Sequence, residues 1–243
     1  HARGFRAYHS FMHVHDLGTL AYRDAWALQE RLHADVVAGG EEQLLLVEHP
    51  PVITLGRRPG LSKNILAAAD ELEKAGVEVV ESDRGGDVTF HGPGQLVAYP
   101  IIRLNDHKLS VGGYVRKLQE IVIDTLNDLG VPSQTDPAAI GVWTCGTDAA
   151  ACELAKICAI GVRIRRGVSM HGLALNVTTD LNYFNLIIPC GLDGRAVTSL
   201  EKILAASVPT MWRVKSALVA RAAAAFAPAA ADTSVISDAA VSK

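Results

Sequence analysis

The chain has 243 residues, of which 49% are hydrophobic and 20% charged, and its formal net charge is −3. This is the composition of an ordinary globular protein with enough sequence for one large domain or two small ones. The mildly acidic balance argues against a general nucleic-acid-binding protein. No apolar run of about 18 residues occurs, so we expect no membrane span. The first residues, His1 to Phe5, lack the apolar stretch of a secretory signal.

Four cysteines, Cys145, Cys152, Cys158 and Cys190, are spaced by seven, six and thirty-two residues. This spacing matches no C-x-x-C metal pattern, so we expect no metal site. A chain of this size does not need disulfides. We therefore expect free thiols in a reducing cytoplasm, of which one or two at most carry chemistry.

The first half of the chain predicts helices and strands after a lead-in over residues 1–14 that has no clear period. Apolar residues at steps of three and four predict a helix over 20–37, which Gly39 ends. The further elements expected here are strands over 44–47 and 52–55, a basic turn over 56–60, a helix over 66–75 and a strand over 77–81.

A glycine-rich stretch, SDRGGDVTFHGPGQ, then runs from Ser82 to Gln95. Glycines this dense let the backbone turn sharply and approach a ligand, and Arg84 and His91 add donors and charge. Two interpretations are open: a hairpin loop without a ligand, because turns favour the same residues, or one wall of a binding site. A strand over 96–99 follows instead of a helix, so the stretch lacks the context of a dinucleotide-binding motif.

The second half of the chain combines helices with a long hairpin. Pro100 is expected to end the strand over 96–99 or to place its tail at a sheet edge. Ser110 is predicted to cap a helix that ends at Gly130. The further elements expected are a strand over 140–143, hairpin strands over 154–165 and 168–177, a strand over 186–188, a helix opened by the capping box Thr198 to Glu201, a helix over 211–226 and a disordered tail over 227–243. This mixture predicts an α+β or mixed α/β fold.

Lys156 and Cys190 are the candidate reactive residues. Lys156 lies on the apolar face of its predicted strand, where it either reaches water at the strand's start or lines a pocket. Cys190 lies between a proline and a glycine after a short apolar run, which places a thiol at the end of a strand. A nearby lysine ammonium would favour the Cys190 thiolate. His49, His91 and His171 leave a Cys–His pair open as well.

Several short motifs stand out along the chain. In order, they are AWALQ over 25–29, EHPPVITLG over 48–56, RGGDVTFHGPGQ over 84–95, AKICAIGVR over 155–163, MHGLALN over 170–176, PCGL over 189–192 and VTSL over 197–200. Together they resemble the signature of the octanoyltransferases of lipoate biosynthesis (lipoyl/octanoyl transferases of the LipB type). The resemblance runs from about residue 14 to about residue 226, and a set of ordered motifs is far more specific than one glycine-rich loop.

The resemblance implies the single mixed-sheet α/β domain shared with biotin and lipoate protein ligases. That catalytic domain would span residues 15–226, between the lead-in and the tail. The resemblance also implies acyl transfer without a cofactor or metal. An octanoyl group would pass from acyl carrier protein to Cys190 as a thioester. It would then pass to a lysine of a lipoyl domain, in a 2-oxoacid dehydrogenase or the glycine-cleavage H protein. Lys156 would favour the thiolate and then accept a proton from the incoming amine.

Three acyl-binding segments are implied by the same motifs. They consist of Arg84, Gly85, Gly86, Asp87, Val88, Thr89, Phe90 and His91, of Ala159, Ile160 and Gly161, and of Gly172, Leu173 and Ala174. Docking of acidic carrier and lipoyl domains would need a local basic patch. The candidates are Arg57, Arg58, Arg163, Arg165 and Arg166, for which a merely solvated surface is the alternative.

Three other functions are compatible with parts of this pattern. They are an ATP-dependent lipoate–protein ligase on the same fold, a thioesterase that uses Cys190 with His91 or His171, and a non-catalytic module that binds carrier proteins. One departure from the family concerns Cys158, where a small residue is expected. On an ideal strand Cys158 faces the same side as Lys156, so it is either a second thiol near the site or a packing residue.

Overall fold

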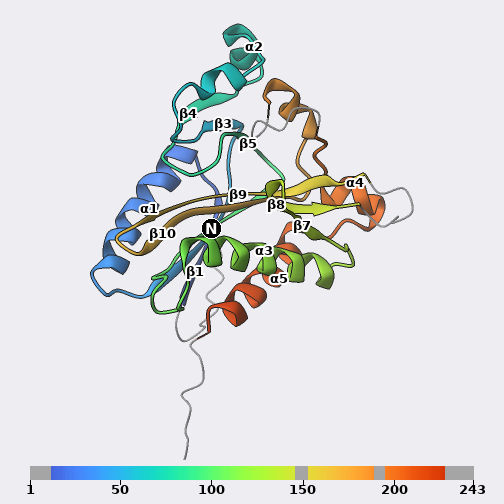
Figure 1. Cartoon of the computed structure of the whole chain (residues 1–243). Coiled ribbons are helices and arrows are strands. Elements are labelled where there is room, and N and C mark those ends of the chain that lie inside the picture. Colours follow the sequence, from blue (N-terminus) through green and yellow to red (C-terminus); the bar gives the residue numbers. More distant parts are fainter. Residues whose placement is uncertain (1–11, 146–152, 189–194, 228–243) are drawn as a thin grey trace, which may run out of the picture.

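The computed structural model describes residues 12–145, 153–188 and 195–227. In these residues a seven-stranded sheet has the order β1-β2-β6-β10-β9-β8-β7, and a smaller sheet has the order β4-β3-β5 (Figure 1). The strands are β1 Met12–Thr19, β2 Glu42–Glu48, β3 Val52–Leu55, β4 Glu78–Glu81, β5 Val88–His91, β6 Gln95–Ile101, β7 Gln134–Asp136, β8 Ala139–Thr144, β9 Ala155–Arg165 and β10 Val168–Asn176. The helices are α1 Tyr22–Val37, α2 Ala69–Lys74, α3 Val111–Asp128, α4 Leu200–Leu204 and α5 Met211–Ala225, with 3₁₀ turns η1 Leu61–Asn64, η3 Leu181–Leu186 and η5 Ala205–Ser207.

Helices cover both faces of the seven-stranded sheet. Helices α3 and α5 pack on one face, and α1 packs on the other, on the side that also carries the three-stranded sheet (Figure 1). The larger apolar core lies between the sheet and the pair α3/α5. Helix α1 buries residues spaced by three and four, among them the polar Gln29 and His33. The α1 side of the sheet is therefore the more polar of the two.

The helices at 20–37 and 211–226, the Ser110-capped helix and the hairpin are confirmed. The Ser110 hydroxyl accepts a hydrogen bond from the Gly113 N–H at 3.1 Å. Strands β9 and β10 pair antiparallel, with Arg165 opposite Val168. The turn residues Arg166 and Gly167 both have positive φ, as a two-residue hairpin turn requires.

Pro100 neither ends its strand nor lies at the edge of the sheet. Strand β6 continues to Ile101 and lies between β2 and β10. The proline is tolerated because the pairing of β10 with β6 extends only to Ala98, so no ladder partner on that side needs a Pro100 N–H. The Ser169 hydroxyl donates to the Pro100 carbonyl at 2.8 Å.

Other sequence-based expectations differ from the structure. Strand β1 begins at Met12, inside the segment expected to lack regular structure. The glycine-rich stretch contains a strand, β5, and β7 was not anticipated. The strand expected over 186–188 is replaced by the 3₁₀ turn η3, followed by one bridge between Ile187 and Ile65. Ser199, and not Thr198, caps α4, because its hydroxyl accepts from the Lys202 N–H.

The tail was predicted over 227–243, and all of it except residue 227 lies outside the described residues. Among the helices that are described, none is both long enough and apolar enough to cross a bilayer.

Candidate functional site

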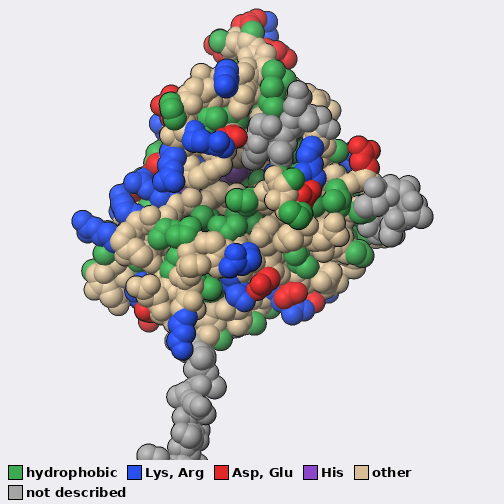
Figure 2. Space-filling view, in the orientation of Figure 1, with side chains coloured by type: hydrophobic (Ala, Val, Ile, Leu, Met, Phe, Trp, Pro, Cys, Tyr) green, Lys and Arg blue, Asp and Glu red, His purple; other side chains and the backbone are tan. Residues whose placement is uncertain are grey.

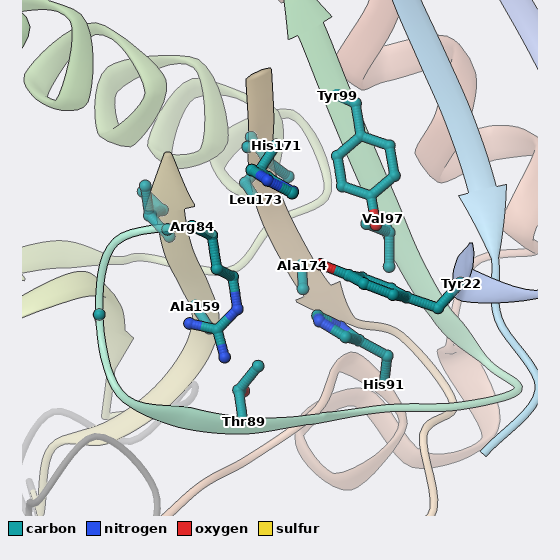
Figure 3. A pocket seen from close by; sticks show the side chains of 14 residues that line it. Tyr22, Arg84, Thr89, His91, Val97, Tyr99, Ala159, His171, Leu173 and Ala174 are labelled. Atoms are coloured by element: carbon teal, nitrogen blue, oxygen red, sulfur yellow. The ribbon is translucent and has the colours of Figure 1, made fainter. Parts of the chain in front are cut away.

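A narrow cavity of about 30 Å³ lies on the α1 side of the large sheet (Figure 3). Its floor consists of small residues on the hairpin: Ala159 of β9 lies opposite Ala174 of β10, and Gly161 lies opposite Gly172. Strand β6 extends this floor, because Val97 is the partner of Ala174. The lining residues are Tyr22, Arg84, Gly86, Thr89, His91, Val97, Tyr99, Ala159, Ile160, Gly161, His171, Gly172, Leu173 and Ala174.

The structure brings together ten of the fourteen residues expected to bind the acyl chain. Gly85 and Asp87 line an adjacent hollow instead. Val88 and Phe90 face away from the cavity, into a core that includes Phe184, and the Phe90 ring stacks on Tyr183 with centroids 4.6 Å apart. The reason is the alternation of β5, on which Thr89 and His91 point to the cavity and their neighbours point to the opposite side.

Arg84 holds the glycine-rich segment against the small sheet. Its side chain is buried, with Arg84 only 6% exposed. The guanidinium donates to the Thr54 carbonyl at 2.6 Å, to the Thr54 hydroxyl at 2.9 and 3.1 Å, and to the carbonyls of Gly85 and Asp87 at 3.0 and 2.8 Å. These N–H groups of Arg84 therefore bind acceptors of the protein itself. Arg84 in this way shapes the wall of the cavity.

The same segment contacts the side of β9 at two glycines. The Gly85 N–H donates to the Val162 carbonyl at 2.9 Å. A Cβ on Gly161 would lie 2.7 Å from the Gly85 carbonyl oxygen, so only glycine at 161 permits this approach. The glycine-rich stretch is thus one wall of a cavity and not merely a hairpin loop.

Another wall of the cavity is built of aromatic and imidazole rings. The Tyr22 and His91 rings stack at 5.9 Å and 9°, and the Tyr22 hydroxyl lies 2.8 Å from the Ser82 hydroxyl. His49 and the Tyr99 hydroxyl form a hydrogen bond of 2.8 Å. Burial lowers the pKa of His49 to about 4 and that of His91 to about 3. Both rings are therefore neutral near pH 7, and His91 is a weak base.

His171 completes the wall from β10. Burial lowers the pKa of His171 to about 3, and its Nε2 forms a 2.7 Å hydrogen bond with Oδ1 of Asp83, whose other carboxylate oxygen pairs with Arg163. The His171 backbone N–H donates to the Gln29 side chain at 2.8 Å. Its other ring nitrogen, Nδ1, is buried without a hydrogen-bond partner among the described residues. A histidine is also visible in the hollow below the small sheet in Figure 2.

Lys156 lines the adjacent hollow and is only 8% exposed, so it does not simply extend into water. This hollow has a volume of about 270 Å³ and shares Gly86, Ile160 and Gly161 with the narrow cavity. The two spaces therefore lie side by side, with these residues between them. The Lys156 Nζ lies 4.8 Å from the centroid of the Trp143 ring, a cation–π geometry.

An irregularity in the pairing of β8 and β9 separates Lys156 from Cys158. Trp143 pairs with Lys156 while the preceding Val142 pairs with Cys158, which leaves Ile157 as an extra residue. Ile157 and Cys158 both lie in the core under α3 and α5. Cys158 is therefore a packing residue, contrary to the ideal alternation, and burial raises its pKa to about 12.

Cys190 lies outside the described residues. The chain on either side of it is anchored: the Ile188 N–H donates to the Asn64 carbonyl at 2.8 Å, and the Lys156 N–H donates to the Ala196 carbonyl at 2.9 Å.

The expectation of four free thiols is wrong for Cys145, which is disulfide-bonded. Within the described ranges no cluster of His, Cys, Asp or Glu could hold a metal ion.

Sequence reasoning missed three lining residues, Tyr22, Val97 and Tyr99, and it had considered His171 only as a partner of a reactive thiol. The alternation of the strand over 96–99 places Val97 and Tyr99 on one face, and this signal could have found them. Tyr22 gives no such signal. It reaches the cavity because α1 packs over β10 and β6, which depends on long-range contacts.

The fold of this chain is shared with solved lipoate protein ligases. A bipartite lipoate protein ligase of Thermoplasma acidophilum has the same fold, with a TM-score of 0.62 and 17% identity over 88% of this chain and 82% of that one. A lipoate–protein ligase A bound with ATP superposes with a TM-score of 0.64 and 15% identity over 88% and 84%. The mixed fold of this type is confirmed.

Residues 21–223 match the family of lipoyl protein ligase A/B catalytic domains, and the chain belongs to this family. Among the curated relatives, an octanoyltransferase of Chloroflexus aurantiacus is 47% identical over 216 residues, which cover 88% of this chain and 93% of the relative.

Proposed function

We propose that the protein transfers an octanoyl group from acyl carrier protein to a lysine of lipoyl domains, in lipoate biosynthesis. The observation that carries this proposal is the narrow cavity with a floor of small residues, which lies beside the hollow at Lys156. The octanoyltransferase named among the relatives supports the same reaction. Burial of an eight-carbon chain at roughly 0.8 kcal/mol per CH₂ would contribute several kcal/mol of binding.

The proposed chemistry has two acyl-transfer steps. The Cys190 thiolate attacks the carbonyl carbon of the donor thioester, forms the acyl-enzyme thioester and releases the carrier thiol. The amine of the target lysine then attacks the new thioester, forms an amide and releases the Cys190 thiolate. Lys156, whose Nζ lies near Trp143, would favour the thiolate as an ammonium and give its proton to the departing carrier thiolate; as the neutral amine it would then take the proton that the target lysine loses. A thioester is already activated, so neither step needs ATP.

Two observations support this pairing of Lys156 with Cys190. Lys156 lies in the hollow beside the cavity, where a reacting carbonyl would sit. Its backbone N–H and C=O are bonded to Ala196 and Thr198, six and eight residues after Cys190 in the chain. A thioesterase pair with His91 gains no such support, because burial keeps the pKa of His91 near 3.

The organisation and partners follow from the same proposal. We assign residues 15–226 to one catalytic domain that works in the cytoplasm, with acyl carrier protein as donor. Lipoyl domains of 2-oxoacid dehydrogenases and the glycine-cleavage H protein would be the acceptors.

Figure 2 shows Lys and Arg side chains along the flank that carries α1 and the small sheet. Of the candidate docking residues, Arg58, Arg163 and Arg165 already pair with Asp87, Asp83 and Glu30, which leaves them less charge for a partner.

Intact-mass measurement after mixing with octanoyl carrier protein, without ATP, tests the proposal. The wild-type protein should gain one octanoyl group, and Cys190→Ala should gain none. Cys158→Ala is the matched control, because its thiol lies in the core and the variant should be acylated like the wild type. Equal acylation of Cys190→Ala would disprove the nucleophile, and a strict requirement for ATP and free acid would identify a ligase.

A further inference from the structure

The length of the cavity floor matches an eight-carbon chain. The floor crosses three neighbouring strands, from Ala159 on β9 through Ala174 on β10 to Val97 on β6. Neighbouring strands lie about 4.8 Å apart, so the two steps span roughly 10 Å. A fully extended eight-carbon acyl chain, with single bonds of about 1.5 Å, is roughly 9 Å long.

The two ends of this floor differ. At β9 the cavity lies beside the hollow that contains Lys156, and Gly86, Ile160 and Gly161 line both spaces. Toward β6 the cavity is lined by Tyr22, the first residue of α1, which is only 2% exposed. Figure 3 shows the Tyr22 ring entering from the α1 side and lying beside Val97 and His91.

The Tyr22 ring is held from several sides. Its hydroxyl is bonded to Ser82 at 2.8 Å, and one face stacks on His91, which is fixed in turn by a 2.7 Å hydrogen bond to Gln95. His49 contacts it edge-on at 5.4 Å. Val52 and Val80 pack with Tyr22 in a small core of their own. A chain that reached further would have to displace a ring in a close-packed environment, which costs free energy.

We propose that Tyr22 is the residue that sets the length of the acyl chain. This inference rests on the proposed transfer of an acyl group at Lys156 and Cys190. The thioester end of the chain lies toward Lys156, and its methyl end meets the Tyr22 ring. Chains of eight carbons fill the floor, whereas chains of ten or twelve carbons meet the ring and are transferred poorly.

Competition among octanoyl, decanoyl and dodecanoyl carrier-protein thioesters tests the proposal, with product masses read on an acceptor lipoyl domain. The wild-type protein should prefer octanoyl over dodecanoyl by at least tenfold, since each misplaced methylene in an apolar pocket is worth roughly 10-fold or more. Tyr22→Ala and Tyr22→Leu should shift that preference toward the longer chains by at least tenfold. Tyr22→Phe keeps the ring and should keep the preference for octanoyl, although it loses the bond to Ser82.

Two results would overturn the proposal. One is a wild-type protein that transfers dodecanoyl as readily as octanoyl. This measurement needs no variant, so it does not depend on whether Tyr22→Ala folds. The other is a folded Tyr22→Ala or Tyr22→Leu protein with the wild-type preference. A wild-type protein that transfers none of the three groups would instead refute the proposed function, and the role of Tyr22 with it.

Discussion

Gly141 on β8 leaves the space that the side chain of Lys156 occupies. A Cβ at position 141 would lie 3.1 Å from Lys156 Cε and 2.7 Å from the Cys158 carbonyl oxygen. Gly141 also has φ of +140°, a region that other residues rarely adopt. The position of the proposed catalytic lysine therefore depends on a glycine in the neighbouring strand.

Gly141→Ala should accordingly reduce both stability and transfer. We expect a loss of more than about 1 kcal/mol in the free energy of unfolding, because alanine is strained at positive φ. Displacement of the Lys156 side chain should slow octanoyl transfer by roughly 10- to 100-fold. Urea unfolding and single-turnover acylation measure the two effects.

Gly167→Ala in the hairpin turn is the matched control. Gly167 has φ of +77°, but a Cβ there would have no atom within 4 Å. The control should lose a similar amount of stability while its rate of transfer stays near that of the wild type. Similar rate losses in both variants would show that Gly141 acts only through backbone strain.

Arg84→Lys should destabilise the fold although the charge is kept. Lysine cannot reproduce the planar fork that serves the Thr54 and Asp87 carbonyls at once, and these buried acceptors would lose partners. We expect a loss of about 2–4 kcal/mol in the free energy of unfolding, from urea titration. Arg57→Lys is the control, because Arg57 lies two residues beyond the end of β3 and is exposed to solvent. This variant should change the free energy of unfolding by less than about 0.5 kcal/mol. Equal effects at the two arginines would contradict this account of the segment.

Stability should fall as the pH is lowered from about 6.5 to about 4. His49, His91 and His171 have pKa values of about 4, 3 and 3 in the folded protein, in each case chiefly through burial. In the unfolded chain a histidine titrates near 6.5. Below that pH the unfolded state binds protons that the folded state does not, so each histidine lowers the free energy of unfolding by roughly 1.4 kcal/mol per pH unit.

Urea unfolding between pH 7.5 and 4.5, with calorimetric proton uptake on unfolding, measures this dependence. His91→Gln should give a shallower slope, because one of the three groups no longer titrates. A free energy of unfolding that stays constant from pH 7 to pH 5 would show that these rings are protonated in the folded state.

The sequence predicted the long amphipathic helices and the hairpin, because their signals are local. It also predicted most of the cavity, since three motifs supply its floor and one wall. The sequence could not predict on which face of the sheet Lys156 and Cys158 lie. The extra residue Ile157 breaks the strict alternation of β9, and only the pairing of β9 with β8 reveals it. Tyr22 was missed for a similar reason: it lines the cavity through the packing of α1, and its own neighbours in the chain give no hint of this.

The hydrogen bond from the Gly85 N–H to the Val162 carbonyl has a further consequence. Strand β8 pairs with β9 only as far as Cys158, so the rest of that side of β9 has no neighbouring strand in the sheet. An open strand edge is a template on which a second chain can add, and proteins commonly cover such edges. The segment that walls the cavity covers this edge at Val162, and an edge covered in this way offers fewer free backbone groups to a second chain. Substitutions in this segment would therefore lower solubility as well as activity.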